Sequence, residues 1–225
     1  MLVPLAGGGQ ETLLSEVGSQ YLLPLFSTAE ACALRLVCRE FLAAVSEQPW
    51  EDGDTVIHGS IAAWRASFPH ACCANVLVRT MYLEAWGWEG RAASVVDADF
   101  VHFEGLRELR MLGCTDVTDA AFAHLRGIHT LDMRACNQVG VTDAAFAHLG
   151  GIHTLFMGGC DQAGITDAAF VHLRGIHTLY IDSCTQAGIT DAAFAHLGGI
   201  RLLCMAECRD FCVAAARALR LPVLL

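Results

Sequence analysis

The sequence predicts an α/β solenoid, in which short strand–loop–helix units stack side by side around one apolar interior. The segment "GIHTLDMRACNQVGVTDAAFAHL" at 127–149 recurs with few changes at 151–173 and 175–197. Self-similarity at a fixed period of this length is the signature of a stacked-repeat architecture. Within each copy, a two-residue apolar alternation is followed by apolar residues at helical spacing, which predicts one strand and one helix per unit.

The strand of each unit is predicted from four apolar residues. In the copy at 127–149 these are Ile128, Leu131, Met133 and Cys136, whose spacing is L-x-x-L-x-L-x-x-C. Leu131 and Met133 alternate with polar neighbours, as expected for a strand that is buried on one face. Parallel pairing of successive strands would form a sheet on the concave side of the solenoid.

The helix of each unit follows a loop that contains Gly140. Thr142 and Asp143 are expected to cap the helix start, because their side-chain oxygens can accept hydrogen bonds from free amides. Phe146 and Leu149 are three residues apart and would face inward from a short helix. The paired glycines at 150–151 would end it on the convex side.

The repeats are expected to fill residues 76–225 with about five to six units. A unit of 22 residues, 105–126, precedes the three near-identical copies. The segments "VRTMYLEAW" at 78–86 and "VVDADFVHF" at 95–103 have the same spacing and predict an earlier unit. The final stretch, "RDFCVAAARALRLPVLL", predicts a last helix and the start of one more strand.

The residues that vary between units lie mostly at outward positions of the strands. Aromatic side chains and both signs of charge gather there, a mixture typical of protein-recognition surfaces. Neutral drift on a solvated face is the alternative interpretation. The predicted partner-binding residues are Tyr82, Arg110, Asp132, Arg134, Phe156, Tyr180 and Asp182.

Cysteine and histidine recur at fixed places in the units, which could suggest disulfides or metal binding. No Cys-x-x-Cys pair occurs, so the recurrent cysteines are expected to be small buried residues. Two histidine ladders also recur, but their alignment follows automatically from duplication. We therefore expect no metal site and no cofactor. The histidines are His124, His148, His172 and His196 on the helices and His129, His153 and His177 before the strands.

Composition restricts the partners and the chemistry. Hydrophobic residues are 54% of 225 and the net charge is −10, which disfavours nucleic acid and anionic membranes as partners. No apolar run approaches the roughly 18 residues that span a bilayer. All 14 basic residues are arginine, so a lysine-dependent phosphate loop or Schiff base is excluded. We expect a protein that is not an enzyme, with a cytoplasmic or nuclear location.

The amino-terminal region lacks the repeat period. Residues 1–10 are expected to be a disordered tail, 11–52 a helical segment and 53–75 a connector. Leu13, Leu14, Val17, Tyr21 and Leu22 are spaced for one helix face. Ser27 or Thr28 can cap a second helix, and residues 41–45 suggest a third.

Both regions resemble known families. The stretches "YLLPLF" at 21–26, "ALRLVCREF" at 33–41 and "QPW" at 48–50 resemble an F-box, although Ser15 occupies the place of the usual proline after Leu14. The repeats, with C-x-x-V-T-D at Cys114–Asp119, resemble the cysteine-containing class of leucine-rich repeats. The whole chain is similar to F-box/leucine-rich repeat proteins, including incomplete ones encoded by giant DNA viruses.

The resemblance implies a substrate-recognition subunit of an Skp/cullin/F-box-type ubiquitin ligase, located in the host cell if viral. Its partners would be an Skp-type adaptor, the cullin scaffold and an unknown protein substrate held on the concave repeat surface. A leucine-rich repeat scaffold with no ligase role is the alternative. The adaptor interface or its supporting core would comprise Leu14, Leu22, Leu23, Leu25, Phe26, Leu36, Val37 and Phe41.

Overall fold

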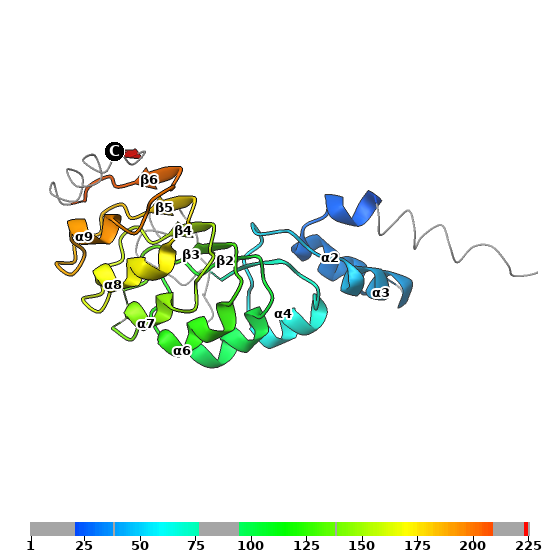
Figure 1. The fold of residues 1–225 in the computed structure, drawn as a ribbon. Helices are drawn as coiled ribbons and strands as arrows, with labels where there is room; N and C mark the ends of the chain where they lie inside the picture. The colour runs from blue at the N-terminus through cyan, green and yellow to red at the C-terminus, as the bar shows by residue number, and fades with distance from the viewer. Residues whose placement is uncertain (1–20, 38, 77–94, 138, 209–222, 225) are drawn as a thin grey trace, which may run out of the picture.

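The described part of the chain contains one parallel sheet and a layer of short helices. The computed structural model describes residues 21–37, 39–76, 95–137, 139–208 and 223–224. Figure 1 shows the strands along the inner side of an arc and the helices along its outer side. The predicted α/β leucine-rich repeat solenoid is confirmed. The strands follow the order of the chain: β1 (Cys73–Asn75), β2 (Glu108–Arg110), β3 (Thr130–Asp132), β4 (Thr154–Phe156), β5 (Thr178–Tyr180), β6 (Leu202–Cys204) and β7 (Val223–Leu224).

The strand register follows directly from the repeat period. Every strand pairs in parallel with its neighbour, so residues one unit apart lie side by side. The central residue of each strand from β2 to β6 is a fully buried leucine aligned with the next, which gives the interior a continuous apolar column. This column consists of Leu109, Leu131, Leu155, Leu179 and Leu203.

The helical layer repeats a four-residue helix with the sequence Asp-Ala-Ala-Phe. Its members are α6 (Asp119–Phe122), α7 (Asp143–Phe146), α8 (Asp167–Phe170) and α9 (Asp191–Phe194), with 3-10 turns η4 (Ala123–Leu125) after α6 and η5 (Val171–Leu173) after α8. A longer 3-10 helix, η3 (Asp97–Phe103), packs against α6. The phenylalanine that ends each α-helix is buried, as predicted for Phe146.

The capping prediction is correct for threonine and wrong for aspartate. Thr142 Oγ1 accepts a hydrogen bond from the Ala144 amide at 3.2 Å, as an N-cap does. The Asp143 carboxylate instead reaches the next unit, where the Thr166 amide and hydroxyl donate to it at 2.7 and 2.6 Å. We call this set of contacts the Asp–Thr ladder. It joins Asp97 to Thr118, Asp119 to Thr142, Asp143 to Thr166 and Asp167 to Thr190.

The recurrent cysteines line up inside the solenoid. Cys136, Cys160 and Cys184 are buried, and each thiol donates to a main-chain carbonyl of the preceding unit at 3.0–3.2 Å. The side chain therefore fills the small space beneath the loop and also satisfies a buried acceptor. The prediction of buried, unbridged cysteines is confirmed at these positions.

The solenoid begins earlier in the chain than residue 76. Helix α4 (Ile61–Ser67) and strand β1 both lie within 53–75, which had been expected to be a connector. Ile61 and Ala74 belong to the same apolar core as the repeats, and β1 pairs with β2. All three residues of β1 are buried, so the alternation of burial seen in β2, β4 and β5 is missing there. The predicted strand at 78–86 lies outside the described residues.

A small helical segment precedes the solenoid. It contains η2 (Leu23–Leu25), α2 (Thr28–Leu34) and α3 (Arg39–Glu47), and Figure 1 shows it next to the α4 end of the arc. Ser27 caps α2 through a capping box with Glu30, which settles the choice between Ser27 and Thr28. Its own core includes Leu23, Ala31, Val45, Trp50 and Phe68.

The opposite end of the solenoid is formed by β7. Val223 and Leu224 pair with Leu203 and Cys204 of β6, which confirms the predicted start of one more strand. Among the described residues, none of the helices combines the length and the apolar character needed to span a bilayer.

Candidate protein-binding surfaces

The sheet presents a row of varied side chains on the surface opposite the helices. Parallel strands lie about 4.8 Å apart, so one outward residue from each unit comes close to the next. In the structure, Asn75 occupies the place next to Arg110 that had been predicted for Tyr82, and Tyr82 lies outside the described residues. The row contains Asn75, Arg110, Asp132, Phe156, Tyr180 and Cys204.

An aromatic pair occupies the middle of this row. The rings of Phe156 and Tyr180 stack with centroids 4.6 Å apart and planes 18° apart, and both side chains are half-buried. The Arg134 guanidinium lies 5.5 Å from the centroid of the Phe156 ring. Stacked aromatics beside an arginine give a large contact area at little cost in side-chain entropy, which is typical of energetically dominant interface residues.

Asp132 is not an exposed contact residue, contrary to prediction. It is 6% exposed because Arg134 covers it, with Nε and Nη2 donating to its two carboxylate oxygens at 2.9 and 2.6 Å. These hydrogen bonds raise the pKa of Arg134 above its ordinary value. Asp132 therefore orients Arg134 over Phe156, and Arg134 is the member of the pair that faces solvent.

The other predicted charged residues are also engaged within the chain. Arg110 donates to Glu108 at 2.8 Å and to Asp54 at 2.7 Å. The Asp182 carboxylate accepts a hydrogen bond from the Ala206 amide at 3.0 Å. These pairs leave Phe156, Tyr180 and the open side of Arg134 as the contact surface at the centre of the sheet.

A second row, which we name the basic rim, runs along the ends of the strands. It comprises Arg107, His129, His153, His177 and Arg201, each one residue before a strand, and each amide from His129 onward donates to the carbonyl of the preceding member. The imidazole rings stack with centroids 4.4 and 4.1 Å apart. Desolvation, followed by repulsion from neighbouring rings and arginines, lowers the pKa of His129 and of His177.

The rim was only partly predicted from the sequence. The three histidines were recognised as a ladder, but Arg107 and Arg201 break the repeat and were not connected with it. Comparing the residue before each strand, rather than only identical residues, would have found them. Within the described ranges, no three His, Cys, Asp or Glu side chains are placed to hold a metal ion.

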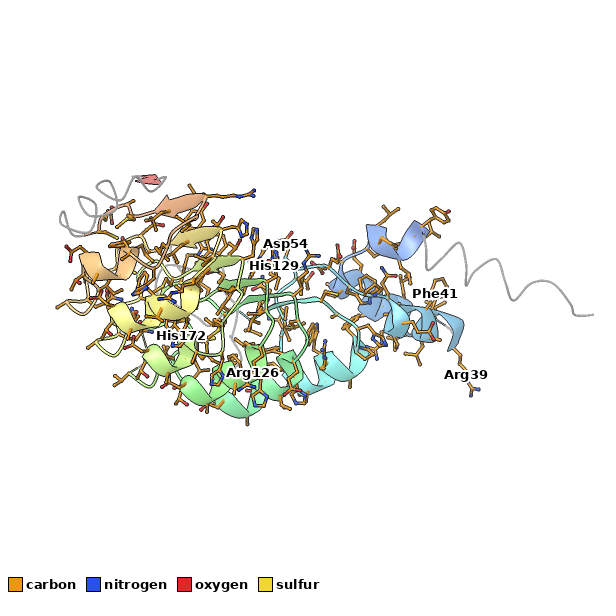
Figure 2. All side chains as sticks on the ribbon, viewed as in Figure 1. Arg39, Phe41, Asp54, Arg126, His129 and His172 are labelled. Carbon is orange, nitrogen blue, oxygen red and sulfur yellow. The ribbon has the colours of Figure 1, made fainter. Side chains whose placement is uncertain are left out.

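The helical segment forms a third surface, which is apolar. Leu36 and Val37 follow α2 and are 87% and 66% exposed, while Leu25 is 78% exposed. Leu22 and Phe26 are also exposed, Phe41 on α3 is half-buried, and Leu23 is buried as supporting core. Figure 2 shows Phe41 on this segment. Leu14 lies outside the described residues, and the exposed Tyr21 and Leu42 had not been predicted.

Comparison with known proteins finds chains of solved structures that match this one and no protein family. A chain in the structure of the Toll–Spatzle complex, described as a molecular hub in Drosophila development and innate immunity, is 10% identical with a TM-score of 0.41. The alignment covers 75% of this chain and 28% of that one. No protein-family model matches the sequence, and no curated protein is similar to it.

Proposed function

We propose that this chain is the substrate-recognition subunit of an Skp/cullin/F-box-type ubiquitin ligase. The helical segment docks on an Skp-type adaptor, and the sheet surface holds a target protein. The chain itself catalyses no bond chemistry and needs no cofactor. It acts by raising the local concentration of a target lysine near the ligase. The proposed location is the cytoplasm or nucleus, in the host cell if the protein is viral.

The observation that supports adaptor docking is the concentration of exposed apolar side chains on the helical segment. Single exposed hydrophobic residues are normal on a monomer surface, whereas a concentration of them in one place is typical of an interface. Among the described residues there are 11, and seven of them fall within 21–42. These seven are Tyr21, Leu22, Leu25, Phe26, Leu36, Val37 and Leu42.

The division between exposed and buried residues also agrees with the F-box resemblance. Leu36 and Val37, in the best-matching stretch, are exposed, whereas Leu23 and Trp50 are buried. The Trp50 indole donates to the Val45 carbonyl at 2.8 Å and packs edge-on against Phe68. The segment thus has its own small core and leaves an apolar face for another protein.

Target binding is proposed for the aromatic pair on the sheet. Phe156 and Tyr180 come from adjacent strands and retain exposed ring surface.

Co-elution with a purified Skp-type adaptor tests the proposal. The full chain is expected to elute with the adaptor in size-exclusion chromatography, and the variant Leu36→Asp/Val37→Asp is expected to elute alone. Val139→Asp is a matched control, because Val139 is 92% exposed and lies on a solenoid loop. It should co-elute like the wild type. Thermal melting of all three proteins establishes that loss of binding is not loss of folding.

A repeat scaffold with no ligase role is the second candidate. Ser15 replaces a proline that the F-box pattern usually has, so one part of the adaptor contact departs from the pattern. Failure of the folded wild-type chain to co-elute with the adaptor would reject the ligase proposal and favour the scaffold.

A further inference from the structure

The basic rim is a row of cationic and titratable groups on the sheet side of an acidic protein. The chain has a net charge of −10, yet five consecutive units place arginine or histidine at the same position. Figure 2 shows His129 on the sheet side, whereas Arg126 and His172 lie on the helix side. The rim therefore borders the surface that carries Phe156 and Tyr180.

The rim is ordered by contacts within the sheet. His129 Nδ1 lies 3.2 Å from the Thr130 hydroxyl and His153 Nδ1 lies 3.1 Å from the Thr154 hydroxyl. These contacts occupy Nδ1 of each ring, and the hydrogen bonds among the described residues leave Nε2 of both rings without a partner. A ring whose Nδ1 accepts from threonine carries its proton on Nε2 and can donate it outward.

The charges around the rim are unevenly distributed. Glu108 and Glu51 lie beside His129, and Glu108 is also bonded to Arg110. Among the described residues, the groups that lower the pKa of His177 after desolvation are His153 and Arg201. Stacked imidazoles flanked by arginine disfavour protonation of one another. An anion placed against them would relieve that repulsion, most strongly from His153 to Arg201.

The dimensions of the rim suit an extended chain. Four strand steps separate Arg107 from Arg201, which is about 19 Å at about 4.8 Å per step. Side chains on one face of an extended peptide recur every 6.6 Å or so, so a segment of about seven residues would cover the rim. A peptide that crosses the strands can place an acidic group on alternate residues along this line.

We infer that the basic rim binds an extended peptide segment that carries anionic side chains, carboxylate or phosphoryl. This inference rests on the proposed use of the sheet as a protein-binding surface and specifies the chemistry of the bound segment. Binding an anion favours the imidazolium form, so the complex takes up protons. Affinity should rise as the pH falls through the histidine range, until the carboxylates themselves become protonated near pH 4.

Fluorescence anisotropy with the full chain tests this inference. The probe is a labelled heptapeptide with glutamate at positions 1, 3, 5 and 7 and serine between them. Binding at pH 6.0 should be roughly three- to tenfold tighter than at pH 7.5, which corresponds to an average uptake of about 0.3 to 0.7 proton over this range. His153→Asn and Arg201→Ala should each weaken it severalfold. The matched controls His172→Asn and Arg126→Ala, on the helix side, should leave it unchanged.

A phosphorylated peptide identifies the source of the negative charge, and a glutamine version tests whether charge is needed at all. A version with phosphoserine at position 3 that binds more tightly than the glutamate peptide assigns the site to phosphoryl groups, and one that binds equally or more weakly assigns it to carboxylates. The inference is overturned if the glutamate peptide does not bind, if a version with glutamine at all four positions binds as well, if affinity falls between pH 7.5 and 6.0, or if His153→Asn has no effect.

Failure here can be distinguished from failure of the proposed function. The peptide titration uses the chain without adaptor, and the adaptor experiment alters Leu36 and Val37, which lie on the helical segment. Loss of peptide binding with intact co-elution would reject the basic rim as a site and leave the adaptor role standing.

Discussion

At the scale of single residues, the Asp–Thr ladder shows how a repeated motif links units as well as forming each one. Asp143 accepts two short hydrogen bonds from Thr166, which itself caps the next helix. The same threonine oxygen accepts from the Ala168 amide at 3.2 Å. The ladder therefore fixes each helix start relative to the preceding helix.

Replacing one rung should destabilise the whole solenoid. Asp143→Asn removes the charge from two charge-assisted hydrogen bonds in a partly buried site, so we expect a loss of about 1–3 kcal/mol in the free energy of unfolding. Urea denaturation followed by circular dichroism measures it.

Asp161→Asn is the matched control. Asp161 is exposed, and its side chain accepts one hydrogen bond, from the Thr185 hydroxyl at 3.2 Å. We expect a loss below about 0.5 kcal/mol. Equal losses for the two variants would show that the ladder has no special role.

Predictions for single residues were wrong where a side chain can form hydrogen bonds with either of two nearby partners. Threonine and aspartate were correctly placed at the helix start, but the pattern does not distinguish an aspartate that caps its own helix from one that reaches the next unit. The prediction that Asp132 is an exposed contact residue was wrong for the same reason. The alternation correctly put it on the outer face, but Arg134, two residues later, folds back over it.

At the scale of elements, Asp52 joins helix α2 to the loop that leads from the helical segment into the solenoid. Its carboxylate accepts hydrogen bonds from the Thr28 amide and hydroxyl at 2.7 and 2.8 Å, and from the Thr55 amide at 3.1 Å. Desolvation opposes ionisation, but the hydrogen bonds from Thr55 and Thr28 outweigh it and hold the pKa of Asp52 at about 2.

This anchor should make the stability depend on pH in acid. Because the pKa of Asp52 is lower in the folded state than in the unfolded state, its contribution is full above about pH 4 and is lost as the pH falls towards 2. Asp52→Asn should lower the free energy of unfolding by about 1 kcal/mol at pH 7 and by progressively less below pH 4. Thermal melts of both proteins from pH 7 to pH 2 measure this. A difference that stays constant over the range would contradict the anchor.

The strands make a contrasting prediction about two adjacent residues. Leu155 is fully buried in the leucine column, whereas Phe156 is half-buried on the outer face. Leu155→Ala should lower the free energy of unfolding by about 2–5 kcal/mol.

Phe156→Ala removes more atoms but should lower the free energy of unfolding by less, about 1 kcal/mol. The main interaction that it removes is the stack with Tyr180. Urea denaturation of both variants gives the comparison. A larger loss for Phe156→Ala would place the core on the wrong side of the sheet.

Elements were predicted well where the repeat pattern is strong and poorly where burial removes it. The strands of the three near-identical copies and the buried Phe146 follow from periodicity alone. Strand β1 does not, because all its residues are buried and its three-residue stretch carries no alternation. The basic rim is intermediate, since its histidines repeat and its arginines do not.

At the scale of the whole molecule, the chain has separate surfaces on one continuous framework. The apolar face belongs to the helical segment, and the aromatic pair and basic rim belong to the sheet. The two regions meet at Trp50, Phe68 and Asp52, where packing and hydrogen bonds join them. The proposed function uses this separation, because it has the adaptor and the target bind at different places.

Thiol accessibility tests the shared interior most directly, since the whole account depends on it. Burial raises the pKa of Cys184 to about 12 and also raises that of Cys160, whereas Cys32 is exposed. With iodoacetamide at pH 8 and peptide mapping by mass spectrometry, we predict rapid modification of Cys32 and protection of Cys136, Cys160 and Cys184 until urea unfolds the chain. Modification of any of these three in native buffer at the rate of Cys32 would contradict the stacked solenoid.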